Sequence, residues 1–148
     1  MRSFDSPAAF AAFLQGVART VPQAEHKAME TASAHHLAEV QKIPGRYHDG
    51  WASLADATKA DRVRKGFPED EPLLRTGALR KSYKRRVINA RLASVGSNDP
   101  RAPLFENGTS KMPPRPVLGT AAKQDGKNVA EIIGQRMHRH LLGGSVED

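Results

Sequence analysis

Four apolar residues near the N-terminus recur at the spacing i, i+3, i+4 and i+7, namely Phe10, Phe13, Leu14 and Val17. Residues at this spacing share one face of an α-helix. Asp5 or Ser6 can cap such a helix, and Pro7 suits its first position because no backbone N–H is needed there. The pattern predicts an amphipathic helix over residues 7–20.

A second, alanine-rich helix is predicted from Pro22, a residue type that favours the start of a helix, to about Ile43. One of its faces carries five residues at helical spacing: Met29, Ala32, His36, Val40 and Ile43. Pro44 and Gly45 end this helix, because the residue before a proline is driven out of the helical region.

A third helix is predicted to begin near Asp49 and to end before Gly66-Phe67-Pro68. Four residues form its shared face: Trp51, Leu54, Ala55 and Thr58. The acidic residues from Glu69 to Glu71 that follow indicate an exposed loop.

The apolar spacing then shortens, and three bulky residues alternate roughly with charged ones: Leu79, Tyr83 and Val87. Leu92 and Val95 follow a polar break at residues 89–91, so the pattern predicts an antiparallel β-hairpin. Its start is open, because residues 79–83 could equally form a helical turn. The cluster at residues 97–100 predicts a turn.

Beyond a proline-rich segment, the spacing of six residues predicts a closing helix: Ala121, Val129, Ile132, Ile133, Met137 and Leu141. Leu118 belongs to the aliphatic face that leads into this helix, so we expect it in the core. Gly143-Gly144 end the helix.

The chain has 148 residues, which is about one domain. We expect a single domain over residues 1–148, with residues 1–20 as a peripheral N-terminal helix. Because 39% of the residues are hydrophobic and only 5% aromatic, the core should be mostly aliphatic and alanine. The absence of cysteine excludes disulfides, thiolate metal sites and cysteine nucleophiles. Neither a secretory signal nor a run of about 18 apolar residues is present, so we expect no membrane span.

The formal net charge of +7 is concentrated in one part of the chain. No acidic residue lies between Pro72 and Asn98, whereas seven basic residues do: Arg75, Arg80, Lys81, Lys84, Arg85, Arg86 and Arg91. Basic residues along a strand could follow the phosphate backbone of DNA, or they could only keep an edge strand soluble. Both interpretations remain open.

Motifs for catalysis are not found, since the chain has no H-E-x-x-H, G-x-S-x-G, G-x-G-x-x-G or Walker sequence. His26 with Glu30, and His35 with Glu39, are spaced i, i+4 and could each supply half of a metal site. Such pairs more often support the helix itself, so we predict no metal and no cofactor. His138 and His140 indicate a solvated C-terminal turn.

Four blocks of sequence follow one another in the second part of the chain: Trp51-Ala-Ser-Leu54 with Thr58, Pro72-Leu-Leu-Arg-Thr-Gly-Ala-Leu-Arg80, Val95-Gly96-Ser97, and Phe105-Glu-Asn-Gly-Thr-Ser-Lys-Met-Pro-Pro-Arg-Pro-Val-Leu118. In this order they resemble the tailed-bacteriophage neck or tail-completion family, of the virion morphogenesis type, which joins heads to tails. The last block is the most specific part of the resemblance. It departs from the family pattern mildly, with Val117 where a phenylalanine is usual and with a shifted aromatic before the acid.

The resemblance implies an α+β fold in which long N-terminal and C-terminal helices pack on a small antiparallel β-sheet. It also implies a structural virion protein without catalysis, which joins the tail to the head-side connector as part of a homo-oligomeric ring. The expected partners are other copies of the chain, the tail terminator or tube, the connector, and DNA if it passes through the channel. The expected location is the virion neck or tail, after assembly in the bacterial host cytoplasm.

We expect the assembly interface to lie in the last block, at ten residues: Phe105, Glu106, Gly108, Thr109, Lys111, Met112, Pro113, Pro114, Arg115 and Pro116. Asn107-Gly108 permits a tight reversal, and the prolines restrict the backbone, so the segment would lose little entropy on docking. Arg115 could pair with a carboxylate of a neighbouring subunit or of its own chain, and both remain open.

An alternative function is a basic DNA-binding module that contacts duplex through residues 75–91. Six of its residues are candidates for contact with DNA or a protein partner: Arg80, Lys81, Lys84, Arg85, Arg86 and Arg91. This alternative explains the local charge but not the proline-rich block.

Overall fold

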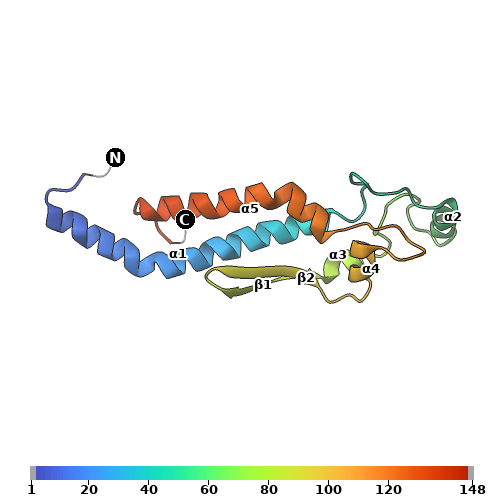
Figure 1. Cartoon of the computed structure of the whole chain (residues 1–148), viewed down its shortest axis with the longest axis horizontal. Coiled ribbons are helices and arrows are strands. Elements are labelled where there is room, and N and C mark those ends of the chain that lie inside the picture. The colour runs from blue at the N-terminus through green and yellow to red at the C-terminus, as the bar shows by residue number, and fades with distance from the viewer. Residues whose placement is uncertain (1–2, 147–148) are drawn as a thin grey trace.

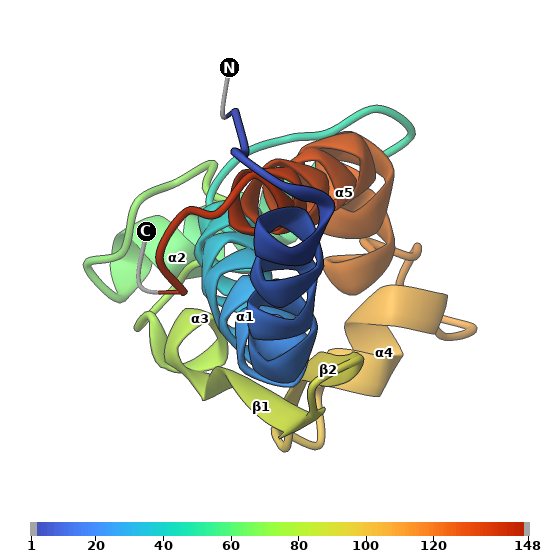
Figure 2. The same cartoon turned by 90° about the vertical axis from the view of Figure 1, so that its left-hand side faces the viewer.

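The structure of the protein, a computed structural model, describes residues 3–146. Figure 1 shows an elongated molecule in which two long helices, α1 (Pro7–Lys42) and α5 (Leu118–Leu141), run antiparallel along its length. The other elements are a β-hairpin and three short helices: β1 (Tyr83–Asn89), β2 (Leu92–Ser97), α2 (Asp56–Arg64), α3 (Ala78–Ser82) and α4 (Ala102–Asn107). The hairpin and α5 cover different sides of α1, as the end-on view in Figure 2 shows. The expected α+β fold is confirmed.

One continuous helix, α1, replaces the two helices predicted on either side of Pro22. It begins at Ser6, whose Oγ accepts the N–H of Ala9 at 3.1 Å. Pro22 lacks the N–H that would bond the carbonyl of Ala18, and Figure 1 shows α1 changing direction in this part of its length. The prediction of a break was wrong because proline has a helical φ angle, and it bends a helix without ending it where neighbouring groups take over the lost bond.

The last turn of α5 packs on α1 close to this bend. His140 is only 5% exposed, and its Nε2 lies 3.2 Å from Oγ1 of Thr20. The expected solvated turn is therefore wrong for His140, although His138 is exposed. Three buried alanines, each four residues apart on α1, allow α5 to approach closely: Ala24, Ala28 and Ala32.

The third helix begins at Asp56, seven residues after the predicted start at Asp49. The preceding segment is held in an irregular conformation by other parts of the chain. The hydroxyl of Tyr47 accepts the N–H of Leu54 at 3.0 Å, and a guanidinium from residue 115 occupies the carbonyls of residues 52 and 53. Backbone N–H and carbonyl groups that would pair with each other inside a helix are thus bonded to side chains from other parts of the chain.

The predicted hairpin is confirmed, with a turn at residues 90–91. Its start, which the sequence left open, is divided: residues 78–82 form the helical turn α3, and the strand begins at Tyr83. Tyr83 pairs with Ser97, and Arg85 pairs with Val95. Alternation along β1 directs Tyr83 and Val87 towards α1 and leaves Lys84 and Arg86 on the exposed face.

The core lies where α1 ends and α5 begins. Seven buried residues from the end of α1, α3, β1, α4 and the start of α5 form it: Val40, Ile43, Leu79, Tyr83, Ala102, Val117 and Ala121. Leu118, which the sequence analysis placed in the core, is only partly buried and packs against this cluster. Val117 takes the fully buried position instead, because the backbone of residue 117 precedes the first turn of α5 and turns its side chain inward.

Tyr83 provides a test of this core. Its side chain is fully buried, its hydroxyl has no hydrogen-bond partner among residues 3–146, and burial raises the pKa of Tyr83 to about 12. Removing an unpaired buried hydroxyl should be neutral or favourable, so we expect Tyr83→Phe to raise the free energy of unfolding by up to about 1 kcal/mol. Tyr83→Ala leaves a cavity and should lower it by about 3–5 kcal/mol. Urea unfolding of both variants measures the difference, and a clear loss in Tyr83→Phe would contradict the assignment.

Candidate docking surface

The segment from α4 to the start of α5 is a closed loop, which we call the docking segment (residues 105–116). Gly108 ends α4 with a positive φ of 72°, and its N–H donates to the carbonyl of Leu104 at 2.9 Å. Thr109 and Met112 then bond each other's backbone at 2.8 and 3.2 Å, which reverses the chain. A Cβ at position 108 would lie 2.8 Å from the nitrogen of Pro114, so only glycine fits this turn.

Glu106 links the two ends of the docking segment. Its carboxylate accepts the backbone N–H groups of Val117 at 2.8 Å, of Leu118, and of Gly119 at 3.4 Å. These are free donors at the N-terminus of α5, where Val117 offers no side-chain cap. Glu106 therefore serves the start of a helix within its own chain.

Arg115 fixes the docking segment to the chain before α2. The side chain is 5% exposed, and its Nη2 donates to the carbonyls of Ala52 at 2.8 Å and Ser53 at 3.1 Å. Its backbone N–H donates to the carbonyl of Phe105 at 2.7 Å. The expected carboxylate partner is not found within residues 3–146, and carbonyl oxygens take its place. Arg115 is an internal brace.

The ten predicted interface residues divide according to their exposure. Four are exposed and form the tip of the segment: Thr109, Lys111, Pro113 and Pro114. Arg115 is buried. The other five are half-buried: Phe105, Glu106, Gly108, Met112 and Pro116. Phe105 packs against the core. One side of the segment is thus bonded to the domain, and the tip is presented to solvent.

Three of the six predicted basic contacts bond groups of their own chain. Arg80 donates to the carbonyl of Pro44 at 2.7 Å, and Arg85 donates to the hydroxyl of Ser33 at 3.3 Å. Arg91 forms an ion pair with Glu25 at 3.2 Å. The side chains of the remaining three make no hydrogen bond or ion pair with residues 3–146: Lys81, Lys84 and Arg86. DNA contact stays a prediction that rests mainly on these three side chains.

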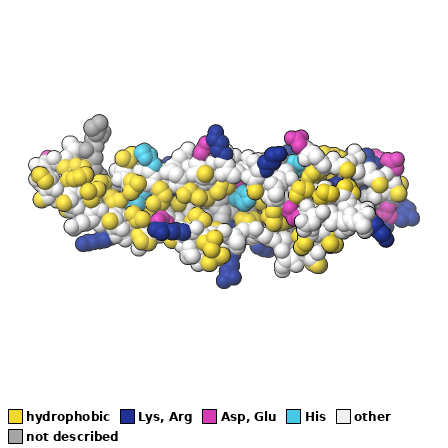
Figure 3. All heavy atoms as spheres, viewed as in Figure 1, with side chains coloured by type: hydrophobic (Ala, Val, Ile, Leu, Met, Phe, Trp, Pro, Cys, Tyr) yellow, Lys and Arg dark blue, Asp and Glu magenta, His cyan; other side chains and the backbone are white. Residues whose placement is uncertain are grey.

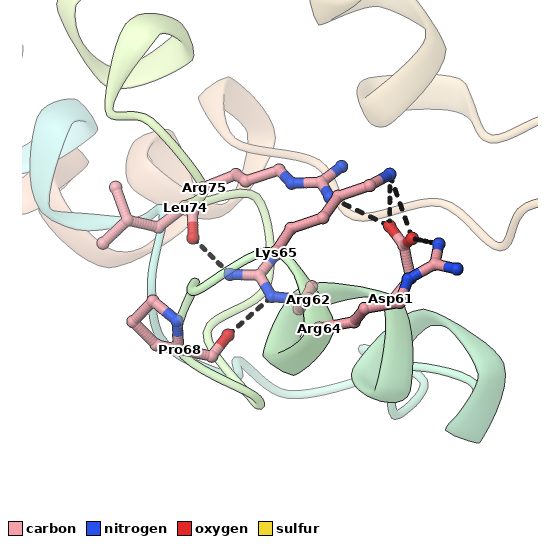
Figure 4. A network of polar contacts seen from close by, with 7 residues as sticks. All are labelled: Asp61, Arg62, Arg64, Lys65, Pro68, Leu74 and Arg75. Atoms are coloured by element: carbon pink, nitrogen blue, oxygen red, sulfur yellow. Dashed lines mark hydrogen bonds and ion pairs between the residues drawn. The ribbon is translucent and has the colours of Figure 1, made fainter.

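A second group of polar contacts holds α2 and the loop after it, as Figure 4 shows. Asp61 binds Lys65 at 2.9 Å, Arg64, and Arg75 at 2.9 Å, and the hydrogen bonds from Lys65 and Arg64 hold the pKa of Asp61 well below its usual range. Arg62 points the opposite way, where its Nε donates to the carbonyl of Pro68 at 2.7 Å and its Nη2 to that of Leu74.

The most buried polar cluster was not predicted. Asp125 on α5 is 3% exposed and lies 2.8 Å from Nε2 of His35 and 2.9 Å from Nδ1 of His36, both on α1. Burial alone would raise the pKa of Asp125, but hydrogen bonds with His36 and His35 outweigh it and lower the pKa. His35 thus bonds across the helix pair and not with Glu39.

Within residues 3–146, no group of three or more His, Cys, Asp or Glu side chains is placed to hold a metal ion. No helix of the described residues is long and apolar enough to cross a membrane. Comparisons with protein families, curated proteins and solved structures found no match to this chain.

The internal role of Arg115 predicts an effect on the isolated chain. Arg115→Ala removes the buried guanidinium that donates two part-buried hydrogen bonds to the carbonyls of Ala52 and Ser53, so it should lower the free energy of unfolding by about 2–3 kcal/mol. Lys111→Ala, at the exposed tip of the same segment, should change it by less than about 0.5 kcal/mol. Urea unfolding compares the two variants. Equal stabilities would show that Arg115 does not brace the segment.

Asp125 predicts a dependence of stability on pH. Because its pKa is lower in the folded state than in the unfolded chain, its contribution is present above the ordinary carboxyl pKa of about 4 and is lost as the pH falls below it. Asp125→Asn should therefore melt below the wild type near neutral pH, and the gap in Tm should narrow in acid. Asp49→Asn, an exposed control, should show no such gap. A gap that stays constant down to about pH 3 would contradict this account.

Proposed function

We propose that this protein is a structural component of the neck or tail-completion layer of a tailed-bacteriophage particle. In this role it joins the tail to the head-side connector as part of a homo-oligomeric ring, and the proposal includes no catalytic step. The observation that carries it is the docking segment, which is fixed to its own domain on one side and exposes a tip of four residues on the other.

The four sequence blocks that carry the family resemblance meet at one end of the molecule. Arg115, from the last block, bonds the carbonyls of Ala52 and Ser53 in the first. Leu79, from the second block, lies in the core with Val117, and Val95, from the third block, packs against the same core. Blocks that are far apart in the sequence thus build one surface, which supports reading them together as a functional unit.

A preformed loop suits assembly on a template. Gly108 permits the tight turn and three prolines restrict the backbone, and Glu106 and Arg115 supply bonds that exist in the isolated chain. Docking then costs little conformational entropy, so a small contact area on each subunit is sufficient when many subunits engage together.

Two apolar surfaces away from the docking segment are available for contacts between subunits. The first turns of α1 extend beyond α5, and Phe10 and Leu14 there are 46% and 47% exposed. An apolar groove of about 390 Å³ lies between α1, β2 and α5, and Figure 3 shows hydrophobic side chains gathered along the middle of this face. Exposed apolar surfaces of this kind favour self-association.

DNA contact is a second candidate role, supported by the unpaired cations Lys81, Lys84 and Arg86. Three phosphate contacts would give a slope of log K against log salt near −2.7, by about 0.9 per contact. An electrophoretic shift of duplex DNA over a series of salt concentrations measures this slope. The joining role does not depend on this contact.

Electron microscopy of particles assembled without the protein tests the proposal directly. We expect complete heads and complete tails that are not joined, and adding the purified protein should restore joined particles. Lys111→Glu should restore far fewer, because the exposed tip has changed charge without loss of the fold. Lys123→Glu, on the exposed surface of α5, is the matched control and should act as the wild type does. Joined particles in the absence of the protein would contradict the proposal.

A further inference from the structure

A pocket beside the docking segment has an unusual concentration of positive charge. Its volume is about 390 Å³, and it lies between α2, α3, α4 and the tip of the segment. Five basic side chains line it, with no carboxylate among the lining residues: Arg62, Arg75, Arg101, Lys111 and Arg115. A pocket lined in this way attracts an anionic group.

Two of these arginines are buried without a carboxylate. Arg62 and Arg115 are each 5% exposed, and both use some of their donors on backbone carbonyls. Nε of Arg115 has no hydrogen-bond partner, and Nη1 of neither arginine bonds any group of residues 3–146. A buried guanidinium is costly unless its charge is paired, so the pocket holds donors that an incoming anion would satisfy.

The other basic residues contribute differently. Arg75 and Arg101 already hold carboxylates of the chain, Asp61 at 2.9 Å and Asp99 at 2.6 Å. Lys111 is exposed and has no bonding partner for its side chain among residues 3–146. The charge left without a counter-ion therefore comes mainly from Arg115 and Lys111, and Arg62 adds a charge whose nearby carboxylate, Asp70, forms no ion pair with it.

The remaining wall of the pocket is largely apolar and includes Leu54, Leu73, Leu79, Phe105 and Met112. A free phosphate would pair with the basic side chains but would leave this apolar wall in contact with water. A peptide with an acidic side chain next to an apolar one would use both, since binding pockets commonly combine apolar walls with a few placed polar groups. The concave shape also disfavours the backbone of a DNA duplex.

We propose that this pocket binds a carboxylate-bearing peptide segment of a partner protein, in which an aspartate or glutamate lies beside an apolar residue. The carboxylate pairs with Arg115, Arg62 and Lys111, and the apolar side chain packs between Leu54 and Met112. Five residues of the pocket belong to the docking segment, so the pocket and the tip form one surface: Phe105, Lys111, Met112, Pro113 and Arg115. The assignment of the partner to the neck of a phage particle rests on the proposed function, whereas the binding chemistry does not.

Blocked dipeptides titrated into the full chain test the pocket. The first probe is N-acetyl-leucyl-aspartate amide, and the neutral control is the same peptide with asparagine. N-acetyl-glycyl-aspartate amide and inorganic phosphate separate the apolar from the charged contribution. Methyl NMR signals of Met112 and Leu54 report the binding. We expect millimolar binding of the leucyl-aspartate peptide and about tenfold weaker binding of the asparagine control, with the glycyl peptide and phosphate also weaker.

Variants localise the effect without risk to the fold. Lys111→Ala should weaken the binding of the leucyl-aspartate peptide several-fold, whereas Lys123→Ala should leave the affinity for this peptide unchanged. Equal binding of the aspartate and asparagine peptides, or no shift at Met112, would overturn the proposal. Phosphate that binds as tightly as the peptide would also overturn it, in favour of a general anion site. The two proposals can fail separately. If the peptide does not bind, the microscopy test of head–tail joining still stands. If particles are joined without the protein, the proposal that the pocket binds an acidic peptide still stands.

Discussion

The packing of α5 against α1 is the contact on which the other elements depend. A two-stranded hairpin and three short helices bury too little surface to be stable alone. The hairpin and α3 pack on α1, and α4 and α2 follow at the end of the pair where α1 ends and α5 begins. Alanines at positions 24, 28 and 32 bring the helices close together, and Asp125 joins them through His35 and His36. A long, stiff pair of helices results, with room for a functional surface at one end.

That surface depends on polar groups used inside the chain. Glu106 bonds the free N–H groups at the start of α5, and Arg115 bonds carbonyls of the segment before α2. The same residues shape the docking segment and anchor it, so its tip is held in place in the isolated chain. The arrangement also explains the buried charge of Arg115, because the guanidinium lies between its own backbone partners and an open pocket.

Local periodicity predicted the long helices and the hairpin, and it failed where distant segments decide. Pro22 indicated a helix boundary, but α1 continues through it, and the last turn of α5 packs beside the bend through His140 and Thr20. Trp51 and Leu54 have helical spacing, yet their segment is not helical. Arg115, more than 60 positions later in the chain, bonds its carbonyls. The contact of Asp125 with His36 could have been predicted from the sequence. Asp125 lies four residues after Ala121, on the apolar face of the closing helix, and His36 lies on the predicted apolar face of the helix that packs against it. The hydrogen-bond partners of Arg115 could not have been predicted, because every residue has a backbone carbonyl and no residue type indicates which ones accept from this arginine.

Amide hydrogen exchange tests most directly whether the docking segment is already formed in the isolated protein. The N–H groups of Thr109, Arg115 and Val117 bond the carbonyl of Met112, the carbonyl of Phe105 and the carboxylate of Glu106. We expect these three amides to exchange as slowly as those in the middle of α5, because they open only when the domain opens. Exchange of all three at the rate of an unfolded peptide would mean that the segment orders only on binding, and would contradict the account.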